Sequence, residues 1–426
     1  MKSKTLIFGD IALLRKETIN PKEINQTAYL GLEHINQNTL SINSIGSSKS
    51  LESNKFIFSK GDILFGKLRP YFRKVYRPNF DGICSTDIWV VQPKSDSICK
   101  DFLFYLMADK RFINFANQGT TGTRMPRANW EHFSKYEVNY FSYNEQREIS
   151  KILRSLDNKI DINRKMNENL EEISKTLFKS WFIDFDPVRA KAEGRGTGFP
   201  KEISDLFPDS FEDSELGKIP KNYKVGKLEE LAKYLNRGVS PSYVESNGVY
   251  LVNQKCIRNG IIDFNLCKQS KEKSSMNERY LEKYDILLNS MGVGTLGRVA
   301  MFYKFDKKIT ADALVTIIKG ESVGSSFFIY YFLERMEDYL NTISVGSTGQ
   351  TSLKKDDILD LQMTIPPKNL LDEFGIQLSM FAEKKYLNNQ ENLILRDLRD
   401  TLLPKLISGE LKVSDAENLI EEASIK

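Results

Sequence analysis

The sequence of 426 residues contains few of the side chains that most often carry out catalysis or hold metal ions. It has only two histidines, His34 and His132, and four cysteines, none of which belongs to a Cys-X-X-Cys pair. The cysteines are Cys84, Cys99, Cys256 and Cys267. Four widely spaced cysteines are not the disulfide framework of a small secreted domain, and the missing ligand spacing excludes a structural zinc site.

Long apolar stretches are also missing. The longest uninterrupted apolar run, Phe327–Leu333, is far shorter than the roughly 20 residues that a helix needs to cross a membrane. Near the N-terminus, Asp10 interrupts the sequence before an apolar segment as long as the core of a signal peptide develops. We therefore expect a soluble, cytoplasmic protein that has no membrane partner.

Motifs for nucleotide chemistry are absent or incomplete. The sequence has no phosphate-binding GxxxxGK[ST] motif and no methyl-donor glycine motif followed by an NPPY-like tetrapeptide. Gly292, Gly294 and Gly297 form a GxGxxG pattern with Asp312 downstream, but a dinucleotide-binding fold needs a helix directly after the glycines. The residues that follow, RVAMFYKF, alternate as in a strand. We predict no cofactor and no metal ion in this chain, and we assign no catalytic residue.

The positive charge is modest overall but locally concentrated. The net charge is +4, yet Lys67, Arg69, Arg73, Lys74 and Arg77 are crowded into one short stretch. Local basic clusters on a nearly neutral chain are typical of a protein that binds nucleic acid at defined contacts. A hydrophobic fraction of 40% and an aromatic fraction of 11% are sufficient for two or three folded domains.

The segment from Glu145 to Phe185 has the pattern of one long helix. It contains neither proline nor glycine, and Pro187 follows it. Apolar residues recur at heptad spacing, which predicts a helix of roughly 50–60 Å with one apolar seam. The first set of seam positions is Ile149, Leu156, Leu170 and Leu177, and the second is Ile152, Met166 and Ile173. A single helix cannot bury such a seam, so it needs a partner.

The second half of the chain repeats the first. YLVNQKCI resembles YLGLEHI, KYDILLNSMG resembles KGDILFGKLR, and ITADALVT resembles CSTDIWVV. The matched pairs Asp62 and Asp285, Asp87 and Asp312, and Gly122 and Gly349 are 223, 225 and 227 residues apart. Phe374, Phe381, Leu395 and Leu402 follow Ile149, Leu156, Leu170 and Leu177 at a constant offset of 225 residues. A constant offset over a whole helix indicates an internal duplication.

The duplication supplies the missing partner helix. We predict an α+β protein in which two mixed α/β domains are separated by two long helices, which pair as an antiparallel coiled coil with a pseudo-twofold repeat. Asn163 and Asn388 would then lie near the middle of the seam, where they could fix its register; the alternative is two exposed asparagines. The predicted boundaries are 1–141 and 223–368 for the domains, 142–186 and 369–412 for the helices, 187–222 for a connector with little regular structure, and 413–426 for an acidic tail.

This order of segments resembles the specificity subunits of type I restriction-modification systems. The similar motifs are KGDILFGKLRP and YDILLNSMG, the TGT and TGQ loops, EQREISKIL, SWFIDFDPV, ELGKIP and LPKLISGEL. The resemblance covers nearly the whole chain, except for the acidic tail after Val413. It implies that each globular domain is a target-recognition domain for one half of a bipartite DNA sequence. The helices would set the spacer and dock methyltransferase subunits.

The resemblance also implies the partners of the chain. The chain would be a non-catalytic specificity subunit that binds double-stranded DNA together with two modification subunits, which use S-adenosylmethionine to methylate adenine. Restriction and translocase subunits, which need ATP and Mg²⁺, would join through the complex. Two other interpretations of the residues stay open, namely a self-contained restriction or modification enzyme and a coiled-coil scaffold without a role on DNA.

Candidate DNA contacts lie in equivalent loops of the two halves. Arginine can form two hydrogen bonds with guanine, asparagine and glutamine can do so with adenine, and lysine more often holds phosphates. In the first domain the candidates are Lys67, Arg69, Arg73, Arg124 and Arg127. In the second they are Asn289, Ser290, Arg298, Gln350, Lys354 and Lys355. Any one of them could instead be an ordinary solvated residue, so the hypothesis depends on the groups.

Overall fold

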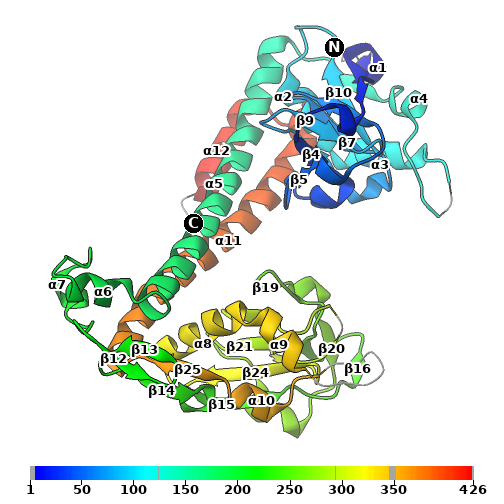
Figure 1. Cartoon of the computed structure of the whole chain (residues 1–426). Helices are drawn as coiled ribbons and strands as arrows, with labels where there is room; N and C mark the ends of the chain where they lie inside the picture. The colour runs from blue at the N-terminus through cyan, green and yellow to red at the C-terminus, as the bar shows by residue number, and fades with distance from the viewer. Residues whose placement is uncertain (1–4, 123, 293, 345–351, 425–426) are drawn as a thin grey trace. The chain divides into compact units, whose positions relative to one another are not determined.

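The computed structural model describes residues 5–122, 124–292, 294–344 and 352–424. The chain divides into two compact units: unit 1 comprises residues 1–164 and 389–426, and unit 2 comprises residues 165–388. The boundary falls within two long helices, α5 (Tyr143–Phe182) and α11 (Lys368–Ser408) (Figure 1). Each unit therefore contains one globular domain and one half of each long helix.

The domain of unit 1 is built on two sheets. The antiparallel sheet has the strand order β2-β10-β7-β8, and the second sheet has the order β3-β6-β9-β4-β5. The first comprises β2 (Ala12–Arg15), β7 (Ile63–Gly66), β8 (Val75–Tyr76) and β10 (Ile88–Pro93). The second comprises β3 (Thr18–Ile19), β4 (Ala28–Leu30), β5 (Gly46–Ser47), β6 (Lys55–Phe58) and β9 (Gly82–Cys84). Beside them, β1 (Thr5–Ile7) pairs with β11 (Glu137–Asn139).

Helices cover the antiparallel sheet of unit 1 and share its core. They are α1 (Phe8–Ile11), α2 (Lys100–Ala108), α3 (Lys110–Gln118), α4 (Trp130–Phe133) and α12 (Val413–Ser424). The core is rich in aromatic rings; those of Phe112 and Phe133 have centroids 4.6 Å apart. Leu153 and Leu406, from the two long helices, belong to the same buried cluster. The helix halves are therefore part of the domain's core.

The domain of unit 2 has the same plan. Its antiparallel sheet has the order β15-β24-β21-β22, and its second sheet has the order β16-β20-β17-β23. The first comprises β15 (Ala232–Arg237), β21 (Ile286–Asn289), β22 (Val299–Met301) and β24 (Val315–Gly320). The second comprises β16 (Tyr243–Val244), β17 (Val249–Val252), β20 (Lys268–Ser270) and β23 (Ile309–Ala311). Two further pairs are β14 (Lys224–Lys227) with β25 (Gln362–Ile365), and β18 (Ile257–Arg258) with β19 (Ile261–Ile262).

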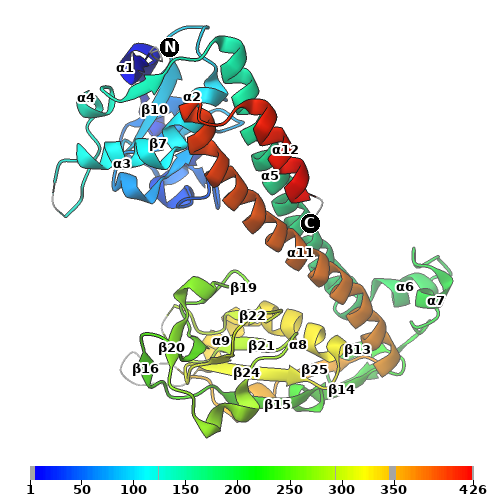
Figure 2. The same ribbon diagram turned by 180° about the vertical axis from the view of Figure 1, so that it is seen from behind.

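One long apolar helix, α8 (Val323–Arg335), lies along the antiparallel sheet of unit 2 (Figure 2). It is buried on nearly all sides because the halves of α5 and α11 in this unit pack on it; the rings of Phe178 and Phe328 have centroids 5.5 Å apart. The helices approach closely at Gly324, where a Cβ atom would meet the carbonyl oxygen of Leu371 at 1.9 Å. Shorter helices are α9 (Glu337–Ile343) and α10 (Lys355–Leu359).

A parallel strand pair marks the repeat within the two sheets. In unit 1, β4 runs parallel to β9, with Tyr29 opposite Ile83. In unit 2, β17 runs parallel to β23, with Tyr250 opposite Ile309. The predicted correspondence of YLGLEHI with YLVNQKCI therefore places equivalent residues at equivalent points of both domains.

The long helices run antiparallel within each unit. In unit 1, Asp157 of α5 bonds Arg399 of α11, whereas Asn163, further along α5, bonds the earlier residue Glu391. In unit 2, Asn167 bonds Asn388, and Phe178, further along α5, contacts the earlier residue Phe374. The predicted first set of seam positions is buried or half-buried throughout: Ile149, Leu156, Leu170 and Leu177 in α5, and Phe374, Phe381, Leu395 and Leu402 in α11.

The second predicted set of seam positions was largely wrong. Ile152 is buried, but Met166 and Ile173 are 37% and 49% exposed. The seam instead uses positions four residues after the first set, such as Leu153, Ile160 and Ser174. A spacing of four keeps the seam facing its neighbours in this stretch of α5, and a spacing of three turns those side chains to solvent.

The connector and the tail contain more regular structure than the sequence predicted. Pro187 lies in the first turn of α6 (Asp186–Ala192), where a proline lacks only a hydrogen-bond donor that would be unpaired anyway. Next come α7 (Lys201–Ser204) and a hairpin of β12 (Phe211–Ser214) and β13 (Gly217–Pro220). Phe207 of this segment packs edge-on against Trp181, with centroids 5.0 Å apart. The acidic tail is helix α12, and Ala416 is buried in the core of unit 1. None of the described helices is long and apolar enough to cross a membrane.

Candidate nucleic-acid interface

In unit 1, the loop after β7 and the glycine-rich loop after α3 are joined by backbone hydrogen bonds. Leu68 and Arg127 form an antiparallel bridge, and the amide of Ala128 donates to the carbonyl of Lys67 at 2.8 Å. The amide of Arg69 donates to the carbonyl of Pro126 at 2.7 Å. The two predicted basic loops therefore form one surface.

The polypeptide turns sharply at the tip of the β7–β8 loop. Arg69 and Arg73 have left-handed backbone conformations, with φ of 52° and 48°, on either side of a 3-10 turn, Pro70–Phe72. Such angles cost non-glycine residues roughly 1–3 kcal/mol and are typical of functional loops. The turn leaves Arg69 partly exposed beside the glycine-rich loop, in which Arg124 is exposed.

Asp87 supports this surface from the neighbouring strand. Its carbonyl accepts from the amide of Lys67 at 2.9 Å, and its carboxylate accepts from Nε of Arg127 at 3.1 Å. Arg127 is still 44% exposed. Lys67, Arg69, Arg124 and Arg127 thus form one basic patch that is open to solvent and able to contact DNA phosphates or base edges.

Arg73 is a correction to the predicted DNA-binding set. It is 2% exposed, and its guanidinium donates to Asp400 at 2.8 and 3.0 Å and to the carbonyl of Ala108 at 2.6 Å. Asp400 also accepts from Arg399, which is 1% exposed and donates to Asp157. Burial opposes ionisation of Asp400, but the hydrogen bonds and charge of Arg73 hold its pKa below the usual value. Arg73 therefore fastens the loop to α11 and has no group available for DNA.

The second unit joins its equivalent loops in the same way. Met291 and Ser352 form an antiparallel bridge, and the amide of Leu353 donates to the carbonyl of Ser290 at 2.9 Å. The offsets of 223 and 225 residues carry the Leu68–Arg127 bridge of unit 1 onto this bridge. Both domains therefore present the same pair of loops.

Asn289 and Ser290 are corrections of the same kind as Arg73. Both are fully buried, at 0% exposure. Nδ2 of Asn289 donates to the carbonyls of Gln254 and Thr295, at 3.1 Å each, and the hydroxyl of Ser290 bonds that of Thr316. They shape the loop from beneath and do not reach its surface.

The remaining candidates of unit 2 lie on the surface of the loops, with one exception. Arg298 is partly exposed and donates to the carbonyl of Gly294 at 2.7 Å, and Lys354 is exposed. Lys355 is exposed and donates to Asn236 at 3.2 Å. Gln350 lies outside the described residues. The glycine-rich run continues into β22 and not into a helix, as predicted when dinucleotide binding was rejected.

Two residues near these loops were missed in the sequence. Arg237, at the end of β15, donates to the carbonyl of Leu353 at 2.8 Å and to the sulfur of Met291 at 3.3 Å. Gln254, just after β17, accepts from the hydroxyl of Thr295 at 3.3 Å. The only signal for Gln254 was its place in YLVNQKCI, one of the repeated motifs.

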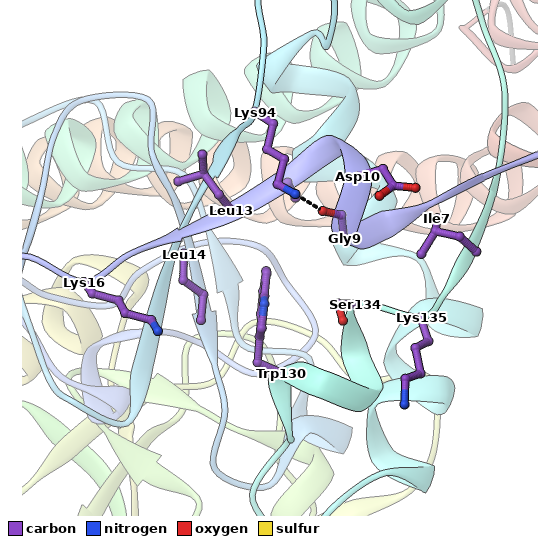
Figure 3. Close-up of a pocket in the computed structure, with 11 residues that line it drawn as sticks. Ile7, Gly9, Asp10, Leu13, Leu14, Lys16, Lys94, Trp130, Ser134 and Lys135 are labelled. Carbon is purple, nitrogen blue, oxygen red and sulfur yellow. Dashed lines mark hydrogen bonds between the residues drawn. The ribbon is translucent and has the colours of Figure 1, made fainter.

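Unit 1 also has a pocket of 480 Å³, which lies between the N-terminal segment and α4 (Figure 3). Lys94 points to the carbonyl of Gly9, and Trp130 stands on the floor, where its ring meets that of Trp89 at 5.5 Å. None of the predicted DNA-binding residues lines the pocket. In the described residues, no group of three or more histidine, cysteine, aspartate or glutamate side chains could hold a metal ion.

An aspartate precedes the central strand in each domain. Asp62 is 2% exposed and accepts from the amide of Ser59 at 2.8 Å and from Gln92 at 2.8 Å. Asp285 is 4% exposed and accepts from the amide of Glu282 at 2.8 Å, with Lys319 at 3.5 Å. Burial raises the pKa of Asp285 to about 6. These repeated aspartates hold the turns that lead into β7 and β21.

Known proteins share both the sequence and the fold. Residues 4–172 and 220–392 match the family described as Type I restriction modification DNA specificity domain. The specificity subunit of the type I restriction enzyme HindI from Haemophilus influenzae is 26% identical over 407 residues, which cover 84% of this chain and 88% of that protein. The MjaIX specificity subunit of Methanocaldococcus jannaschii is 27% identical over 413 residues, which cover 93% of this chain and 87% of that protein.

One solved structure is similar over almost the full length. It is the crystal structure of a type I restriction-modification system S subunit from M. genitalium, with a TM-score of 0.54 and 14% identity, covering 95% of this chain and 96% of that chain. At this identity the likeness concerns the fold, which the two chains share.

Proposed function

Because the chain belongs to the family of type I restriction modification DNA specificity domains, and is therefore a non-catalytic DNA-binding specificity subunit, we propose that each of its two recognition domains reads one half of a bipartite DNA target. The observation that carries this proposal is the repeated loop pair. Lys67 and Leu68 are bonded to the glycine-rich loop of unit 1 as Ser290 and Met291 are bonded to the equivalent segment of unit 2.

The proposed contacts follow from exposure and chemistry. In the first domain, Lys67, Arg69, Arg124 and Arg127 supply the contacts, with arginine able to form two hydrogen bonds with guanine. In the second domain, Arg298, Lys354 and Lys355 supply phosphate contacts, which fix orientation without reading sequence. Buried Arg73, Asn289 and Ser290 hold these loops in place.

The long helices have a separate role in this proposal. They form an antiparallel coiled coil that separates the two recognition domains, sets the spacer between the half-sites, and docks two methyltransferase subunits. Those subunits supply methylation of adenine with S-adenosylmethionine, and restriction and translocase subunits with ATP and Mg²⁺ join through them. The antiparallel contacts within each unit support this arrangement, since they fit a seam with pseudo-twofold symmetry.

Exchange of the domains tests the proposal. A chain in which residues 1–141 and 223–368 are exchanged, assembled with its methyltransferase partner, should methylate a target whose half-sites have changed places and whose spacer has its original length. Sequencing of methylated DNA from cells that carry each chain gives both half-sites and the spacer. A spacer that changed with the domains would contradict the role of the helices, and gel shifts without sequence preference would favour a scaffold.

A further inference from the structure

We infer that Gln254 reads a base, with adenine as the partner its carboxamide fits best, and that Asn289 is the positioning residue for it. The inference rests on the proposed function of unit 2 as the reader of one half-site. Gln254 lies on a third segment of that domain, the turn Asn253–Cys256, in addition to the two loops that the repeat had indicated.

The turn that carries Gln254 is held by its own side chains. The amide of Lys255 donates to Oδ1 of Asn253 at 2.9 Å, and the amide of Cys256 donates to the carbonyl of Asn253 at 2.9 Å. The amide of Asn253 donates in turn to Sγ of Cys256 at 3.4 Å. Cys256 itself is fully buried. A turn bonded in this way presents its second residue, Gln254, in a fixed position, as preorganised recognition requires.

Asn289 connects this turn to the reading loop from below. Its Nδ2 donates one hydrogen bond to the carbonyl of Gln254 and another to the carbonyl of Thr295, both at 3.1 Å. Its Oδ1 is buried and accepts no hydrogen bond from the described residues. An unpaired buried oxygen costs about 1–3 kcal/mol, so a leucine would suit this core position better. Retaining an amide here has a reason if the amide fixes Gln254 against the loop.

The side chain of Gln254 lies across the glycines of that loop. Its Oε1 accepts from the hydroxyl of Thr295 at 3.3 Å and lies 2.1 Å from the point that a Cβ atom of Gly292 would occupy. Gly292 has a φ of 109°, which side-chain-bearing residues rarely adopt. The glycine in this position therefore leaves room for the carboxamide, and Thr295 orients it.

The orientation leaves hydrogen-bonding capacity for a base. A glutamine oxygen has two lone pairs, and the bond from Thr295 uses one. The second lone pair and an N–H group together match N6 and N7 of adenine in the major groove. Lys255, Arg298 and Lys354 belong to the same three segments and are suited to phosphates. An amide among cations is the pattern expected of one base contact held by backbone contacts.

The first domain has a different side chain at the same place. The repeat aligns Gln254 with Glu33, which is 66% exposed, on the segment that follows β4. That segment also lies against the end of the central strand, since a Cβ atom on Gly66 would meet Leu32 at 2.8 Å. Glutamate accepts hydrogen bonds and is suited to the amino group of cytosine. Two domains that read different half-sites are expected to differ at such a position.

The test compares base preferences of variants in complex with the methyltransferase partner, using a library of duplexes with randomised sequence. We expect Gln254→Ala to lose preference at one base pair of one half-site by about 10- to 100-fold while other positions keep theirs. Gln254→Glu should move the preference at that position from adenine toward cytosine. The matched control Lys255→Gln should weaken binding of all sequences equally.

Asn289→Leu separates positioning from a purely structural role. A positioning role predicts relaxed preference at the same base pair as Gln254→Ala, with the remaining preferences intact. Equal weakening at all positions of that half-site would make Asn289 merely structural. Unchanged preference in Gln254→Ala would overturn the inference while leaving the proposed function in place. A native complex without any sequence preference would overturn the proposed function itself.

Discussion

Nδ2 of Asn163 donates to Oδ1 of Asn392 at 3.1 Å, and the two side chains are only 2% and 5% exposed. In the other unit, Asn388 donates to Asn167 at 2.8 Å. The offset of 225 residues that relates the two long helices carries the first pair onto the second. Asn163 and Asn388 are therefore buried seam residues, as predicted, although each is paired with an asparagine one turn away in the repeat. Buried amide pairs can fix the register of a coiled coil at some cost in stability.

Breaking one of these pairs should cost more stability than removing it. Asn163→Leu leaves buried Asn392 without its donor, and we expect it to lower the free energy of unfolding by about 1–3 kcal/mol. The double variant with Asn392→Leu should recover most of that loss, because neither partner is left unpaired. Urea unfolding of the two single variants and the double variant measures the coupling.

Exposed Asn158 of α5 offers the control for this cycle. Asn158→Leu should change the free energy of unfolding by less than about 0.5 kcal/mol. Additive effects of the two seam substitutions would mean that the hydrogen bond does not couple them. Replacing all four asparagines should stabilise the seam but loosen its register, and an unaltered spacer in the methylated sequence would contradict that role.

Two arginines of one loop should respond in opposite ways. Arg73→Ala removes a buried guanidinium from Asp400, and breaking a buried pair from one side costs about 3–5 kcal/mol of stability. Arg69→Ala should leave the free energy of unfolding nearly unchanged and weaken DNA binding, because its side chain is partly exposed beside the glycine-rich loop. The two residues share a left-handed backbone, so each is the control for the other.

Unfolding curves and gel shifts on both variants measure these effects. A stable Arg73→Ala variant with weakened DNA binding would restore Arg73 to the set of DNA contacts.

The contrast between these arginines also marks the limit of the sequence. The repeat was sufficient to predict the strands that contain Ile63 and Leu287, the paired loops, and the first set of seam positions. Arg73 looked like its neighbour Arg69 because its partner, Asp400, is 327 residues away in the chain. A basic loop residue that points inward has the same local pattern as one that points outward.

Gln254 was missed for a related reason. Its turn reaches the reading loop because β17 runs parallel to β23 and because buried Asn289 binds its carbonyl. Neither contact leaves a local pattern in the sequence. The helix seam failed differently, since spacings of three and four are both compatible with an amphipathic helix, and only packing decides between Ile173 and Ser174.

Asp285 should make the stability of unit 2 depend on pH. Burial raises its pKa to about 6, above the ordinary value of 3.8, so the folded state binds this proton more tightly than the unfolded state. The stabilisation is complete below about pH 3.8 and is lost as the pH rises through about 6. The wild type should therefore gain up to about 3 kcal/mol relative to Asp285→Asn between pH 7 and pH 4.

Urea unfolding of both proteins across this pH range gives the difference directly. Asp306→Asn, at an 87% exposed position of the same unit, should show no comparable dependence. A constant difference between wild type and Asp285→Asn would exclude a raised pKa.

The salt dependence of DNA binding should identify which cations of the loops contact phosphate. Each phosphate contact releases counterions, so its removal lowers the slope of log affinity against log salt by about 1. We expect this decrease for Arg124→Gln in unit 1 and for Lys354→Gln in unit 2, because both side chains are exposed on the proposed reading surfaces. Lys151→Gln removes the same charge from a 75% exposed position on α5 and should leave the slope unchanged. Equal decreases in all three variants would indicate a general effect of net charge and would remove the support for defined contacts at these loops.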